Sequence, residues 1–96
     1  MSPPEVLSGE AVDRVLADGG SQWTRQASEL VRVVRRADFA QALAFVNAVG
    51  VLAEAADHHP DIDIRWNTVT LRLSTHSAGG LTDKDLSLAA AIDALG

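Results

Sequence analysis

An alternation of apolar and polar residues between positions 62 and 74 constrains the fold of this chain more than any other feature. The apolar members of the alternation are Ile62, Ile64, Trp66, Val69, Leu71 and Leu73. Because successive strand residues point to opposite faces of a sheet, this period of two predicts two half-buried strands, 62–67 and 68–75. We place the turn between them at Asn67-Thr68, so that the two strands form an antiparallel hairpin.

Signals outside this hairpin predict two more strands and three helices. They are a helix from Gly9 to about Ala17 between a Ser8 cap and Gly19-Gly20, strands 21–26 and 29–36 joined through Ala27-Ser28, a helix from Phe39 to about Ala56 after an Asp38 cap, and a helix from Thr82 to about Leu95. Thr82 and Asp85 have the spacing of a capping box, and residues 77–80 are expected to form a flexible loop. The order α-β-β-α-β-β-α predicts an α+β fold, a four-stranded antiparallel sheet with three helices on one face.

Length and charge exclude several classes of protein. The 96 residues are enough for one small domain, 1–96, and the net charge of −5 lacks the basic excess that direct nucleic-acid binding needs. Without cysteine there is no disulfide, thiolate metal site or thiol nucleophile. The apolar stretches look far shorter than the ~20 residues of a membrane span, and the opening Met-Ser-Pro-Pro-Glu does not resemble a signal peptide. We therefore expect a cytoplasmic protein, and the richness in Ala, Val and Arg hints at a bacterial source.

The long helix predicted over residues 39–56 is apolar around most of its circumference. Its polar interior positions are only Gln41, Asn47 and Glu54. Such a helix usually buries a second face, which in so small a domain predicts contact with another copy in a symmetric dimer or a higher assembly. The alternative is a helix that packs deeply against its own sheet.

Three histidines, His58, His59 and His76, are the side chains best suited to chemistry, since an unperturbed imidazole has a pKa of about 6.5. The predicted hairpin places the start of its first strand beside the end of its second, so all three imidazoles are expected at one end of the sheet. Glu54 precedes His58 by one helical turn and can orient its ring. Asp85 lies in the first turn of the last helix, where free amide groups can also bind a polar ligand edge.

Each of these residues has a simpler interpretation. His58 can merely finish a helix, His76 can be an ordinary surface histidine, and Glu54 and Asp85 can be a solvated side chain and a cap. A zinc site of three histidines lacks the His-x-x-x-His spacing that a single helix uses. A Ser-His-Asp nucleophilic site lacks its Gly-x-Ser-x-Gly elbow, and no glycine-rich phosphate loop is present.

The order and spacing of several motifs resemble one family. They are Ala53-Glu54, Asp57-His58-His59-Pro60-Asp61, Trp66-Asn67-x-Val69, Leu73-Ser74-Thr75-His76, Gly80-Leu81-Thr82-x-x-Asp85 and Leu88-Ala89-x-x-Ile92. Together they are similar to the pterin-4a-carbinolamine dehydratases, strongly over residues 53–93 and weakly, through Trp23 and Asp38-Phe39, over most of the chain.

The resemblance implies dehydration of 4a-hydroxytetrahydrobiopterin to quinonoid dihydropterin and water, which recycles the cofactor of aromatic amino-acid hydroxylases. It implies histidine acid/base catalysis with no metal or redox cofactor, a homo-dimer or homo-tetramer, and an aromatic amino-acid hydroxylase as a functional partner. Some family members also act as dimerisation cofactors of transcription regulators, so a non-catalytic interaction protein is the alternative.

The resemblance also implies roles for individual residues. His58 and His76 correspond to the acid/base pair, and His59 to a group that binds and orients the substrate. The implied substrate-binding residues are Glu54, Asp57, Pro60, Ile62, Ile64, Trp66, Ser74, Thr75 and Asp85.

Overall fold

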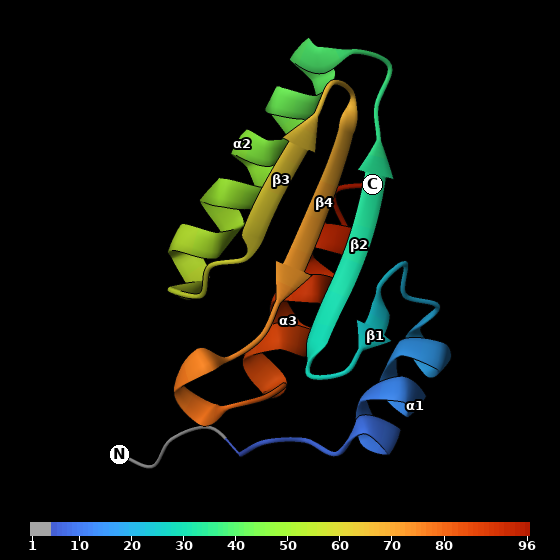
Figure 1. Cartoon of the computed structure of the whole chain (residues 1–96), viewed down its shortest axis with the longest axis vertical. Helices are drawn as coiled ribbons and strands as arrows, with labels where there is room; N and C mark the ends of the chain where they lie inside the picture. Colours follow the sequence, from blue (N-terminus) through green and yellow to red (C-terminus); the bar gives the residue numbers. More distant parts are fainter. Residues whose placement is uncertain (1–4) are drawn as a thin grey trace.

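Four strands form one antiparallel sheet in the computed structural model, which describes residues 5–96 (Figure 1). They are β1 (Thr24–Gln26), β2 (Glu29–Arg35), β3 (Asp61–Arg65) and β4 (Thr68–Leu73), in the order β1-β2-β4-β3. Strands β2 and β4 are therefore central, and β3 has one free edge. The expectation about a signal peptide concerned Met1 to Glu5 and falls almost entirely outside the described residues.

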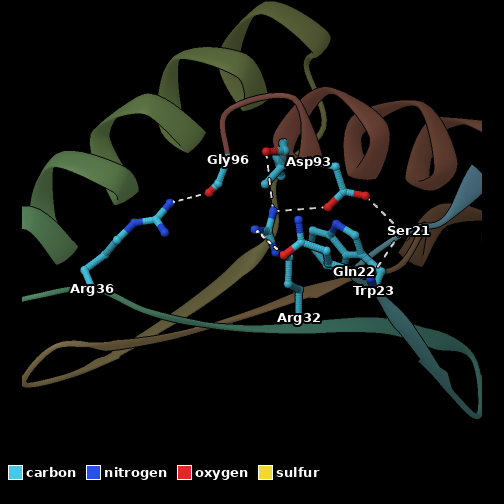
Figure 2. A network of polar contacts seen from close by, with 8 residues as sticks. Ser21, Gln22, Trp23, Arg32, Arg36, Asp93 and Gly96 are labelled. Carbon is cyan, nitrogen blue, oxygen red and sulfur yellow. Dashed lines mark hydrogen bonds and ion pairs between the residues drawn. The ribbon is translucent and has the colours of Figure 1, made fainter.

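Within residues 5–96, three α-helices accompany the sheet, α1 (Gly9–Gly19), α2 (Phe39–Ala56) and α3 (Asp83–Asp93). Each begins at a predicted cap, because the side chains of Ser8, Asp38 and Thr82 accept a hydrogen bond from a backbone N–H in the first turn. Figure 2 shows α2 and α3 on the same side of the sheet, and α1 contacts β1 and lines a cavity shared with α3. The element order and the α+β fold agree with the prediction.

The core lies between the sheet and these helices. Strand pairing places Leu30 opposite Leu73 and Val34 opposite Val69, and all four side chains are buried against residues of α2 and α3. The opposite face of the sheet carries polar side chains, Val33, which is 63% exposed, and Val31, which is 5% exposed. The alternation along residues 62–74 thus marks a sheet with one buried face.

An arginine that the sequence patterns do not single out lies on the buried face. The guanidinium of Arg32 donates to Oδ1 of Asp93 at 3.1 Å, to Oε1 of Gln22 at 3.1 Å and to the carbonyl of Ile92 at 3.4 Å (Figure 2). Burial lowers the pKa of Arg32, although the Asp93 carboxylate opposes that effect. These contacts attach the end of α3 to β2, and a bond from Arg36 to the Gly96 carbonyl adds to them.

Two local predictions were wrong. The β3–β4 turn is Trp66-Asn67 rather than Asn67-Thr68, because Thr68 pairs with Arg65 and already belongs to β4. Trp66 has φ +56°, the left-handed conformation that tight hairpin turns need at their first position. Residues 77–80 are not a simple loop, since His76–Ala78 form a 3₁₀ turn that a bridge between Thr75 and Gly80 closes.

Helix α2 keeps an uncovered apolar side. Its buried residues are Ala42, Phe45, Val49 and Ala53. Phe39, Leu43 and Val51 remain exposed, the last at 70%, so the helix is not packed deeply against its own sheet all round. By length and composition its 18 residues suffice to cross a membrane, which corrects our expectation of shorter apolar stretches. This is weak evidence for a membrane, because core helices of soluble proteins meet the same criterion.

Candidate functional site

Four chain segments meet at one end of the sheet (Figure 1). The end of α2, the start of β3, the end of β4 and the start of α3 lie there, and Asp61 pairs with Arg72. The prediction that the start of the first hairpin strand lies beside the end of the second is therefore confirmed. This pairing brings the chain segments that carry the histidines to one region.

The end of α2 directs His58 inward. Asp57, in the left-handed conformation with φ +50°, caps the helix, and the amide of His58 donates to the Ala53 carbonyl. This reversal leaves the His58 side chain only 11% exposed, with Nε2 2.6 Å from Oδ1 of Asp85. The imidazole is held in place by a residue on α3.

Asp85 is the centre of a buried hydrogen-bond network. Its side chain is fully buried, and Oδ2 accepts from Thr75 Oγ1 at 2.7 Å and from the backbone N–H of Thr82 at 2.9 Å. The hydroxyls of Thr75 and Thr82 are 2.8 Å apart. A buried carboxylate is costly unless its oxygens are satisfied, and these contacts satisfy both.

His59 has a separate partner. Its Nε2 lies 2.5 Å from Oε2 of Glu54, and the two side chains are 57% and 79% exposed. The prediction that Glu54 orients His58 is wrong, because the reversal at Asp57 turns His58 toward α3 and brings His59 back beside Glu54. The two adjacent imidazoles thus have different environments, one enclosed and one solvated.

His76 lies at the surface, directly after the buried Thr75. It borders a cavity of about 420 Å³, which we call the His76 cavity, lined by Ser28, Glu29, Ser74, Thr75, His76, Gly79 and Gly80. His58 borders a different cavity of about 350 Å³, the His58 cavity, lined by Leu52, Ala56, His58, Asp83, Lys84, Ser87, Leu88 and Ala91. The contact between Asp85 and Thr75 connects the segments that carry the two histidines.

The remaining predicted site residues divide between the two ends of the hairpin. Asp57 and Pro60 flank the histidine pair, and Ser74 lines the His76 cavity. Ile62 and Ile64 lie on the edge strand β3, with Ile64 packed against the core. Trp66, 66% exposed, forms the turn at the opposite end, so the structure does not bring it to the histidines of its own chain.

Sequence reasoning missed some residues near His58. Lys84 and Ser87, on the first turns of α3, line the His58 cavity, and no motif indicated them. Thr82 was predicted only as a helix cap, yet it also bonds Thr75. Among residues 5–96, no group of three or more His, Asp or Glu side chains is arranged to hold a metal ion.

Comparison with known proteins identifies a family for this chain. The family model described as "Pterin 4 alpha carbinolamine dehydratase" matches residues 5–95. A protein of Nocardia farcinica named "Putative pterin-4-alpha-carbinolamine dehydratase" is 53% identical over 91 residues, 95% of each chain. One of the same name from Chloroflexus aggregans is 62% identical over 87 residues, 91% of this chain and 93% of the relative.

Solved structures share the fold. A Brucella melitensis protein described as a transcriptional coactivator/pterin dehydratase superposes with a TM-score of 0.87 at 26% identity, over 95% of this chain and 98% of that one. A pterin dehydratase-like protein described as a RuBisCO assembly factor in the alpha-carboxysome gives a TM-score of 0.62 at 25% identity, over 78% and 87%. Fold and relatives together define a hydro-lyase of the dehydratase class. The chain belongs to the pterin-4a-carbinolamine dehydratase family.

Proposed function

We propose that this protein dehydrates 4a-hydroxytetrahydrobiopterin to quinonoid dihydropterin and water, with His58 and His76 as the acid/base pair. The reaction removes a proton from N5 and a hydroxyl group from C4a of the pterin. It therefore needs one group that accepts a proton and another that gives a proton to the leaving oxygen, and imidazoles perform both near neutral pH. Each such transfer contributes about 10²–10⁴-fold to the rate.

The observation that carries the proposal is the environment of His58. A fully buried carboxylate, that of Asp85, holds Nε2 of the ring at 2.6 Å and leaves its other nitrogen for a ligand. A positioned imidazole of this kind is typical of acid/base sites. Because Asp85 also bonds Thr75, the residue before His76, both imidazoles belong to segments that one network connects.

The other family positions have supporting roles in this proposal. His59 and its partner Glu54 bind and orient the pterin from the solvent side, and the backbone of Ile62–Ile64 offers a free strand edge to its polar rim. We propose a cytoplasmic homo-dimer or homo-tetramer that forms through the exposed apolar side of α2. An aromatic amino-acid hydroxylase, as the source of the carbinolamine, is the proposed functional partner.

The test is the dehydration rate of chemically prepared 4a-hydroxytetrahydropterin. We expect the wild type to accelerate it and His58→Ala or His76→Ala to lower the rate at least about tenfold with the fold intact. Arg65→Gln, at a side chain 85% exposed, is the control and should match the wild type. Unchanged rates in both histidine variants would remove the catalytic assignment.

A non-catalytic interaction role is the second candidate. It is favoured by the exposed Phe39, Leu43 and Val51 on α2 and by the coactivator and assembly-factor descriptions of the two structural relatives. A partner protein whose capture survives His58→Ala and His76→Ala but is lost on Val51→Lys supports this role.

A further inference from the structure

We infer that the hydroxyl of Thr82, acting through Thr75, positions Asp85 so that His58 carries its proton on Nε2 and works through Nδ1 as the general base. The inference rests on the proposed dehydration and adds to it a positioning residue, Thr82, and an assignment of the reacting nitrogen. Thr82 is fully buried, and its hydroxyl lies 2.8 Å from that of Thr75.

The direction of each hydrogen bond follows from counting protons. Thr75 Oγ1 donates its only proton to Oδ2 of Asp85, so in the contact between the two hydroxyls it must accept. Thr82 Oγ1 is therefore the donor to Thr75, and it accepts in turn from the backbone N–H of Lys84. Both hydroxyl groups therefore have a single orientation, in which Thr82 donates to Thr75 and Thr75 donates to Asp85.

The same count determines the tautomer of His58. An ionised carboxylate only accepts, so the His58 nitrogen 2.6 Å from Asp85 Oδ1 must carry a proton. In the neutral ring the proton is then on Nε2, and Nδ1 has a free lone pair. Nδ1 makes no hydrogen bond to residues 5–96 and is not among their buried atoms without a partner. The ring lines the His58 cavity, from which a ligand can approach it.

These constraints divide the chemistry between the two histidines. The N5 proton of the substrate passes to Nδ1 of His58, and the electron pair left on N5 forms the C4a=N5 bond. The C4a–O bond breaks as protonated His76 gives its proton to the leaving oxygen, which departs as water. Asp85 stabilises the imidazolium formed at His58, and solvent then restores both histidines to their starting states.

The alternative explanation of Thr82 is that it is only the N-cap of α3. A cap contributes to stability, whereas it does not determine the tautomer of a histidine on another segment. Ser8 is the matched control, because its hydroxyl caps α1 by accepting from the Ala11 N–H at 3.1 Å and has no connection to His58.

The experiment records two-bond ¹H–¹⁵N correlations of the histidine rings in the full ¹⁵N-labelled chain at about pH 8.5, where free imidazoles are neutral. The His58 signals are assigned by their loss in His58→Gln. We expect the Nε2–H pattern in the wild type, Thr82→Ser and Ser8→Ala. Without the Thr82 donor the Thr75 hydroxyl can turn away from Asp85, and the less restrained carboxylate no longer holds Nε2 in every molecule. In Thr82→Val an Nδ1–H population should therefore appear, and in Thr75→Val, which removes the direct donor, it should be larger.

Kinetics give the second measurement. We expect Thr82→Val to lower kcat about tenfold with KM within about twofold, while Thr82→Ser stays within about twofold in both. An Nδ1–H tautomer in the wild type overturns the inference, even if Thr82→Val does not fold. A folded Thr82→Val variant that keeps the wild-type tautomer and the wild-type kcat also overturns the inference. Because the tautomer is read without substrate, an inactive protein that shows Nε2–H refutes the proposed dehydration and not the proton assignment.

Discussion

Asp85→Asn changes the centre of the buried network while preserving its shape. The asparagine carbonyl can still accept from Thr75 and from the Thr82 N–H, but its amide group then faces His58 Nε2. An amide nitrogen donates and does not accept, so Nε2 must become the acceptor and the His58 proton must move to Nδ1. The substitution thus blocks the nitrogen to which we assign proton removal.

The size of the effect follows from the contacts. A hydrogen bond to a charged group contributes about 1.5–3 kcal/mol and one between neutral groups about 0.5–1.5 kcal/mol. The two retained bonds each lose about 1 kcal/mol, and the altered contact with His58 adds a similar amount, so the free energy of unfolding should fall by roughly 2–3 kcal/mol. For a domain of this length that lowers Tm by roughly 10–20 °C, and kcat should fall about 10²–10⁴-fold.

Thermal and urea unfolding measure the loss of unfolding free energy in Asp85→Asn, and the dehydration assay measures the fall in kcat. Asp83→Asn is the control for stability, because Asp83 lies in the same helical turn but outside the network, and its cost should stay below about 1 kcal/mol. If Asp85→Asn unfolds like the wild type and retains its rate within twofold, the reasoning about the buried carboxylate is refuted.

Three further predictions concern stability and assembly. Asp93→Ala should lower the unfolding free energy by about 2–4 kcal/mol in urea titrations, because it leaves the buried Arg32 without its carboxylate partner. Arg32→Met should cost less than half of that, and equal costs contradict this explanation. Light scattering should give a mass above the 10.1 kDa of one chain, and Val51→Lys should reduce it; a wild-type monomer at micromolar concentration contradicts association through α2. The hydrogen bond to Arg25 holds the pKa of Asp13 below its ordinary 3.8, so the pair stabilises the fold above that pH and this stability is lost as pH falls through the lowered pKa. Asp13→Asn should weaken the fall of the unfolding free energy in acid, and an unchanged fall refutes this reasoning.

Much of the fold could be predicted because its signals are local. Alternation placed β3 and β4, and the caps Ser8, Asp38 and Thr82 placed the helix starts, since a cap depends on residues only two or three positions away. The meeting of the hairpin ends followed from antiparallel pairing alone.

The pairing of histidines with carboxylates could not be predicted, because it depends on backbone conformation and on distant segments. Glu54 has the correct helical spacing for His58, yet the left-handed conformation of Asp57 exchanges the two imidazoles and gives His58 to Asp85, 27 residues away. Trp66 was assigned to the substrate site through the family resemblance alone, and both the predicted turn and the observed turn place it at the hairpin end opposite the histidines. The partners of the buried Arg32 come from segments far apart in the sequence, and no periodic pattern indicates them.

The most direct test of the whole account is a titration of the ¹⁵N-labelled protein with a stable dihydropterin, in which the ring signals of the three histidines are followed separately. If His58 and His76 belong to one pterin site, both rings shift with the same Kd, and His58→Ala abolishes the response of His76. Saturation that moves only one of these two rings, or neither, contradicts the shared site.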